Sequence, residues 1–84
     1  MRRDILFVGN RLILNESFER YIVRHIKEKL IGIDSINFFE ESDKGLFLHL
    51  EQLLKTESKV VIITTKNTFT IVGKLLSTVT ADNQ

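Results

Sequence analysis

The 84-residue sequence contains no cysteine, no proline and only two histidines. Without cysteine, the chain has no disulfide framework and no thiolate nucleophile, and two isolated histidines do not form a zinc site of the familiar spacing. Without proline, no predicted helix or strand is interrupted by a residue that lacks a backbone N–H. These absences argue against redox chemistry and against a bound metal.

Long hydrophobic runs are also lacking, and neither sign of charge dominates. No stretch of about 18 apolar residues is present to span a membrane, and the apolar run between Asp4 and Gly9 is too short for the core of a signal peptide. The formal net charge is +1, and a mild basic bias in residues 1–30 falls short of the surface of a nucleic-acid-binding protein. We therefore expect a cytoplasmic protein without membrane or nucleic-acid partners, folded as a single domain over residues 1–84.

The chain alternates short apolar runs with amphipathic stretches. The short runs predict strands over residues 4–8, 33–39 and 59–64. Apolar residues that recur every three or four positions predict helices over residues 17–30, 43–55 and 68–79. Gly32 stands where the first helix should end, and residues 80–84 have no pattern and are expected to fray. Side chains able to cap the three helices are, in chain order, Asn15 or Ser17, Ser42 or Asp43, and Asn67 or Thr68.

This order of elements predicts a small three-layer α/β fold, β-α-β-α-β-α, with a parallel sheet and right-handed crossovers. Val60 to Ile63 form an unbroken β-branched run, which is typical of a strand that helices cover on both faces. If the two crossovers run in opposite directions, the strand order is 2-1-3 and a crevice opens between the carboxyl ends of strands one and three. The turn at residues 9–11 then faces the threonine-rich turn at residues 64–70.

Several segments resemble the molybdopterin-binding domain family, which includes the amino-terminal domain of competence/damage-inducible protein CinA and the MoaB/MogA-type proteins. Residues 5–15, ILFVGNRLILN, resemble the family's opening strand and its Gly-Asp-Glu-Leu-Leu turn, with Asn10 and Arg11 in place of the acidic pair. Residues 60–65, VVIITT, resemble its Val-Ile-Thr-Thr strand, but residues 66–71, KNTFTI, replace the glycine-rich turn and the aspartates that follow there. Because the family module is about twice as long as this chain, the resemblance implies the first half of a molybdopterin-binding-like fold.

The resemblance implies a pterin-phosphate or nucleotide-like ligand, molybdopterin among the candidates, bound weakly or no longer bound at the carboxyl ends of strands one and three. The residue types there also suit an anion, since they supply hydroxyl and amide donors, cations and the free N–H groups of a helix amino terminus. The alternative for this stretch is a strand-to-helix turn with its capping residue, for which threonine and asparagine are common. The candidate ligand-binding residues are Gly9, Asn10, Arg11, Thr64, Thr65, Lys66, Asn67, Thr68 and Thr70.

The spacing assembles no nucleophile, general base or carboxylate pair, so the sequence does not predict an enzyme. His25 and His49 lie on predicted helices beside apolar residues, as packing or surface histidines do. Two functions stay open: a degenerate molybdopterin-binding-like domain with a small phosphate-bearing ligand, and a non-catalytic interaction or regulatory module that oligomerises or docks a partner. A three-stranded sheet leaves apolar edges for a second copy to cover, or for the remainder of a longer polypeptide of which residues 1–84 are the amino-terminal half-domain.

Overall fold

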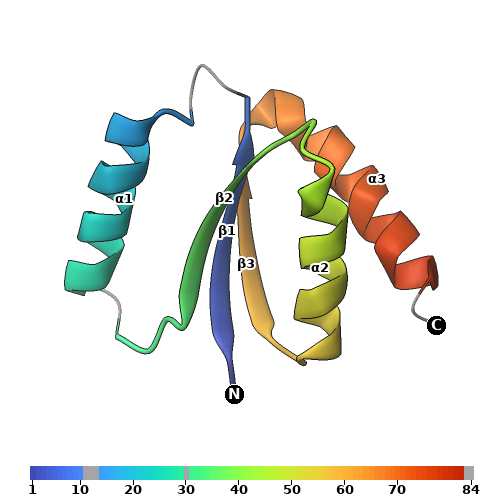
Figure 1. Cartoon of the computed structure of the whole chain (residues 1–84), viewed down its shortest axis with the longest axis horizontal. Helices are drawn as coiled ribbons and strands as arrows, with labels where there is room; N and C mark the ends of the chain where they lie inside the picture. Colours follow the sequence, from blue (N-terminus) through green and yellow to red (C-terminus); the bar gives the residue numbers. More distant parts are fainter. Residues whose placement is uncertain (11–13, 30, 83–84) are drawn as a thin grey trace.

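The structure is a computed structural model that describes residues 1–10, 14–29 and 31–82. The strand order is β2-β1-β3, and β1 pairs in parallel with both neighbours. Figure 1 shows α1 on one side of the sheet and α2 and α3 on the other, so the predicted three-layer α/β arrangement and the 2-1-3 order are confirmed. The elements are β1 (Arg3–Gly9), α1 (Glu16–Lys29), β2 (Ser35–Glu40), α2 (Gly45–Lys55), β3 (Lys59–Thr64) and α3 (Lys66–Asp82).

Strand β1 is the buried centre of the molecule. Successive side chains of a strand point to opposite faces, and Leu6 and Val8 accordingly pack in the core that α2 and α3 form. Phe7 points the other way, where its ring stacks on Phe38 of β2 at 5.0 Å and meets Phe18 of α1 edge-on at 6.3 Å. Because β1 has a strand on either edge and helices on both faces, its apolar run is buried throughout.

The first two helices begin close to where the sequence predicts. Asn15 caps α1, since its Oδ1 accepts a hydrogen bond from the Phe18 N–H at 2.9 Å. At α2 the cap position is Lys44, which makes no side-chain capping hydrogen bond, so the prediction of Ser42 or Asp43 was wrong. Asp43 still supports the start of α2, since its Oδ1 accepts from the Gly45 N–H at 2.8 Å. Helix α1 ends at Lys29, and Gly32 follows in the connection to β2 with φ +90°, a conformation that favours glycine.

Helix α3 begins earlier and ends later than predicted. It begins at Lys66, and Thr65 caps it by accepting a hydrogen bond from the Thr68 N–H at 3.2 Å, so the prediction that Asn67 or Thr68 is the cap was wrong. The threonine-rich stretch is therefore the first turns of a helix rather than a loop. Residues 80–82 continue α3, which corrects the expectation that they fray, and residues 83–84 lie outside the described residues.

Strand β3 has the predicted bounds, but helices do not cover both of its faces. Val60 and Ile62 are partly buried against the core of α2 and α3. Val61 and Ile63 point to the α1 side, where they remain 51% and 42% exposed. The prediction of two-sided coverage was wrong because α1 is the single described helix on that side, and one helix does not reach across three strands. Of the three strands, β1 rather than β3 has both faces covered.

Candidate functional site

The carboxyl ends of β1 and β3 lie side by side, as the strand order requires. On the α1 side of the sheet they enclose a cavity of about 100 Å³, lined by Gly9, Thr64 and Thr65 together with apolar side chains that include Leu14 and Phe18. Three of the candidate ligand-binding residues therefore meet in one cavity, at the edge of the sheet where the crevice is predicted. Because the other walls are apolar, the cavity offers few polar groups to a ligand.

The amino terminus of α3 is occupied by the protein's own groups. Thr68 is fully buried, and its hydroxyl donates to Oε2 of Glu41 at 2.7 Å. The Thr65 hydroxyl in turn bonds Oγ1 of Thr68 at 2.9 Å. Glu41 lies in the turn after β2, so its carboxylate reaches the helix end that favours negative charge. Because like charges repel, this internal carboxylate competes with any external phosphate.

The remaining candidate residues do not converge on the cavity. Lys66, Asn67 and Thr70 are exposed on the first turns of α3, and none of them lines it. The backbone carbonyl of Asn10 accepts a hydrogen bond from the Leu14 N–H at 3.0 Å, which closes the turn after β1. Arg11, the candidate cation of that turn, lies outside the described residues. The structure thus divides the predicted site into a small crevice and an exposed helix turn.

Gly9 lacks the geometry that makes a glycine indispensable beside a phosphate. A Cβ added at Gly9 would lie 3.5 Å from Cγ of Leu14, an ordinary van der Waals contact. Its φ is not positive either. An alanine would therefore fit at this position without strain, and the match of Gly9 to the resembled family does not depend on close approach of a ligand.

A buried carboxylate at the opposite end of the sheet was missed by sequence reasoning. Asp4 is 1% exposed and accepts hydrogen bonds from the hydroxyls of Ser35 and Ser58, and from Nε and Nη2 of Arg2 at 3.2 and 3.1 Å. Burial alone would raise the pKa of Asp4, but the hydrogen bonds from Ser35, Ser58 and Arg2 outweigh it, so the pKa lies below its ordinary value. Because Ser35 begins β2 and Ser58 precedes β3, Asp4 ties the amino ends of all three strands together.

Next to Asp4, a cavity of about 190 Å³ lies between β2 and α2. Arg2, Asn37, His49 and Gln52 contribute to its lining. The His49 ring packs on Phe39 at 4.9 Å, and its Nε2 is buried without a hydrogen-bond partner among the described residues. The prediction that His49 is a packing histidine fits this position. His25 is exposed on α1, stacked on Tyr21 at 5.4 Å.

An open cavity lies on the α1 side of the sheet, over β1 and β3. Its volume is about 440 Å³, and Val61 and Ile63 line it together with Ile5 and Ile26. Arg3 and Lys59 line its end at the amino termini of the strands. Ile63 also lines the crevice at the carboxyl end. We call this apolar surface, from Lys59 to Ile63 and across to Ile26, the open face.

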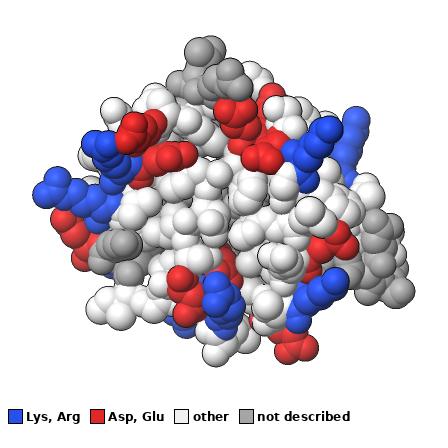
Figure 2. Space-filling model, in the orientation of Figure 1, with Lys and Arg blue, Asp and Glu red and all other residues white. Residues whose placement is uncertain are grey.

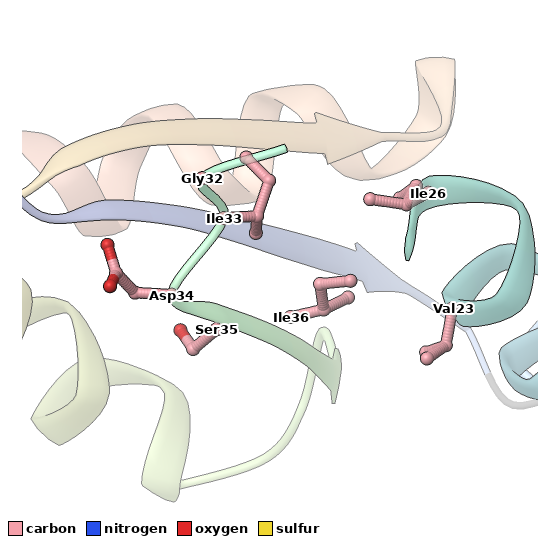
Figure 3. Close-up of a pocket in the computed structure, with 7 residues that line it drawn as sticks. All are labelled: Val23, Ile26, Gly32, Ile33, Asp34, Ser35 and Ile36. Carbon is pink, nitrogen blue, oxygen red and sulfur yellow. The ribbon is translucent and has the colours of Figure 1, made fainter. Parts of the chain in front are cut away.

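The contact between α1 and β2 is hollow as well. Figure 3 shows Val23 and Ile26 of α1 on one side of a cavity of about 290 Å³ and Ile36 of β2 on the other. The Asp34 carboxylate points away from the two α1 side chains, and its Oδ2 accepts a hydrogen bond from the Arg3 N–H at 2.7 Å. The α1 layer therefore has a cavity at its contact with β2 and another over β1 and β3.

Charges are mixed and peripheral on the visible face of the molecule. Figure 2 shows lysine, arginine and acidic side chains around the margin and an uncharged middle over the strands. On α1 the exposed Arg20 pairs with Glu16, and Arg24 pairs with Glu28 at 3.5 Å. Such interspersed charges do not form the continuous basic surface by which proteins bind nucleic acid.

No family model, curated protein or solved structure matches this chain. Within the described residues, no helix is long and apolar enough to cross a membrane. In the same part of the chain, no three acidic or histidine side chains gather as a metal site. No relative therefore assigns a role to these residues, and a function has to be inferred from their geometry.

Proposed function

We propose that this chain is a non-catalytic cytoplasmic interaction module, and that its open face is the surface a partner covers. The observation that carries the proposal is the exposure of Val61 and Ile63, which stand at 51% and 42% on the face of a parallel sheet. Faces of parallel sheets are normally covered on both sides. Fully burying such a side chain contributes about 1.5–3 kcal/mol. Val61 and Ile63 are each about half exposed, so a partner that covers both gains about 1.5–3 kcal/mol of binding free energy in total.

Site-specific photo-crosslinking tests this function. A photoreactive amino acid replaces Val61 in cells that produce the protein, and a matched chain carries it at Leu48, which is 62% exposed on α2. We expect discrete adducts from position 61 and none of the same mass from position 48. Adducts of twice the chain's mass would identify the partner as a second copy. No adducts, or the same adducts from both positions, would contradict the proposal.

A second candidate is the degenerate molybdopterin-binding-like domain, with a pterin-phosphate or nucleotide-like ligand in the crevice. The meeting of Gly9, Thr64 and Thr65 in one cavity favours it, and the Glu41 carboxylate at the start of α3 opposes it. The test is a titration of ¹⁵N-labelled protein with pterins and nucleotides. Saturable changes in the chemical shifts of the Gly9 and Thr65 amides would support ligand binding. Unchanged chemical shifts would refute it.

A further inference from the structure

The open face has the shape and charge to receive one particular kind of partner. Resting on the proposed interaction function, we propose that its occupant is an amphipathic α-helix from another protein, with acidic side chains at the end that lies over Arg3 and Lys59. The helix packs on Val61 and Ile63 beside α1, and so completes the second helical layer of the sheet.

The dimensions of the open face suit a helix. Its floor is β1 and β3, and its wall is the side of α1 that carries Phe18 and Ile26. Strand β3 has six residues, a length of about 20 Å at about 3.3 Å per residue, which a helix of about 13 residues matches at 1.5 Å per residue. The described helices already cover the rest of the sheet in this manner (Figure 1). A single apolar stripe, with residues at i, i+3 or i+4, and i+7, fills such a groove.

The charge at one end of the open face calls for a negative partner. Arg3 and Lys59 are directly opposite each other in the pairing of β1 and β3, and both are exposed. Their register places them on the same face as Val61, and two like charges on neighbouring strands repel each other. Among the described residues neither forms an ion pair. Two carboxylates lie nearby. The Asp4 carboxylate is bound to Arg2, Ser35 and Ser58, and the exposed Asp34 carboxylate accepts the backbone N–H of Arg3. Neither pairs with the side chains of Arg3 and Lys59, so an acidic partner would supply their counter-charge.

A second copy of the chain does not supply such a helix from its described part. Helix α1 uses its apolar stripe on its own sheet. Its outer surface carries Arg20, Arg24 and their paired glutamates, and Tyr21 is its single large exposed apolar side chain among the described residues. The large exposed apolar residues of α2 are Leu48 and Leu54, and those of α3 are Phe69 and Ile71. Neither pair has a spacing of three or four residues, so neither helix presents a second stripe. The described helices of a second copy therefore offer no apolar stripe to the open face, which favours a helix from another protein as the occupant.

Selection from a random 16-residue peptide library identifies the preferred occupant. Binders of the purified protein are enriched, and binders of the double variant Val61→Lys, Ile63→Lys are removed. Both substituted side chains are already half-exposed and β3 is an edge strand, where lysine is tolerated; unchanged circular dichroism verifies the fold. The matched control carries Leu48→Lys and Leu54→Lys on the opposite layer.

We expect the enriched peptides to repeat apolar residues at helical spacing and to carry Asp or Glu toward one end. Their affinity should fall at least tenfold for the β3 double variant and stay unchanged for the α2 control. Neutralising Arg3→Gln or Lys59→Gln should weaken binding about two- to fivefold at low salt, while Lys55→Gln on α2 should have no effect.

Three results would overturn the inference. Peptides with alternating apolar residues would indicate strand addition to the free edge of β3 instead of helix docking. Enriched peptides that lack acidic residues, and whose affinity does not change with Arg3→Gln or Lys59→Gln, would refute recognition by charge. If no enriched peptide depends on Val61 and Ile63 for binding, the proposal of a helical partner on the open face is refuted. If crosslinks at position 61 persist in that case, the interaction function stands and only the helical partner fails; if they are also absent, both fail.

Discussion

Replacing Asp4 is the sharpest test of what holds the sheet together. The carboxylate is 1% exposed and receives four hydrogen bonds, two from Arg2 and one each from Ser35 and Ser58. Asp4→Asn keeps the shape but removes the charge, and Asp4→Ala removes every acceptor. Both leave hydroxyls at the amino ends of β2 and β3 without the anion that they now share.

The expected loss follows from the number and kind of these bonds. A hydrogen bond to a charged group contributes about 1.5–3 kcal/mol, but neighbouring bonds are not additive. The ion pair itself adds little because the Arg2 side chain is 48% exposed. We expect Asp4→Ala to lower the free energy of unfolding by about 3 kcal/mol and Asp4→Asn by about 2 kcal/mol. For a domain of this size, each kcal/mol lowers the Tm by about 4–8 °C.

The same carboxylate makes stability depend on pH in a defined direction. The folded-state pKa of Asp4 is lowered, so its contribution is fully present above the ordinary aspartate pKa of about 3.9 and is lost as the pH falls from there through the lower folded pKa. The difference in unfolding free energy between the natural chain and Asp4→Asn should therefore be constant above about pH 5 and shrink below about pH 4.

Urea denaturation followed by circular dichroism at pH 3, 4, 5 and 7 measures both effects. Asp34→Asn is the matched control, since Asp34 is exposed and its carboxylate accepts the Arg3 N–H; we expect it to cost less than about 1 kcal/mol. If Asp4→Asn is as stable as the natural chain at pH 7, or if the gap between them widens in acid, the assigned role of Asp4 is refuted.

Three further substitutions test local features by urea or thermal denaturation. Gly73→Ala should raise the free energy of unfolding by about 0.5–1 kcal/mol, because a Cβ at this exposed helical position meets no atom within 4 Å; a loss would contradict the described helix. Gly32→Ala should lower it by about 1 kcal/mol or more, because φ is +90° there, and an unchanged Tm would argue against that backbone conformation. Thr68→Val should lower it by about 1–3 kcal/mol, since the buried hydroxyl joins Thr65 to Glu41; equal stability would show that this network contributes nothing.

The sequence predicted the architecture because each element carries its own periodicity. Residues 59–64 have the composition of a strand, and the structure places β3 at those residues. The alternation of strands and helices predicted parallel pairing without any knowledge of long-range contacts. Coverage of the sheet was not predictable from the same run, since the exposure of Val61 depends on where α1 lies and not on its own neighbours in sequence.

The candidate site was harder to predict for the same reason. Thr65, Asn67 and Thr68 are all able to cap a helix, and local sequence does not choose among them. The choice depends on Glu41, 27 positions before Thr68, which holds the Thr68 hydroxyl in the interior. Asp4 was missed because its partners Ser35 and Ser58 lie 31 and 54 positions away. The one signal in the sequence is an aspartate placed at the head of an apolar run.

The chain's lack of cysteine permits a direct measurement of whether the open face is an interface. Single-cysteine variants Val61→Cys and Leu48→Cys, both at half-exposed or more exposed positions, are labelled with a permeant maleimide in the producing cells and again after purification. If the open face is an interface, the two purified variants should be labelled at similar rates. In cells, the labelling of position 61 should be at least tenfold slower than that of the purified variant, and the labelling of position 48 should not be slowed. Equal labelling of both positions in cells, or a position 61 that is already unreactive in the purified protein, would contradict it.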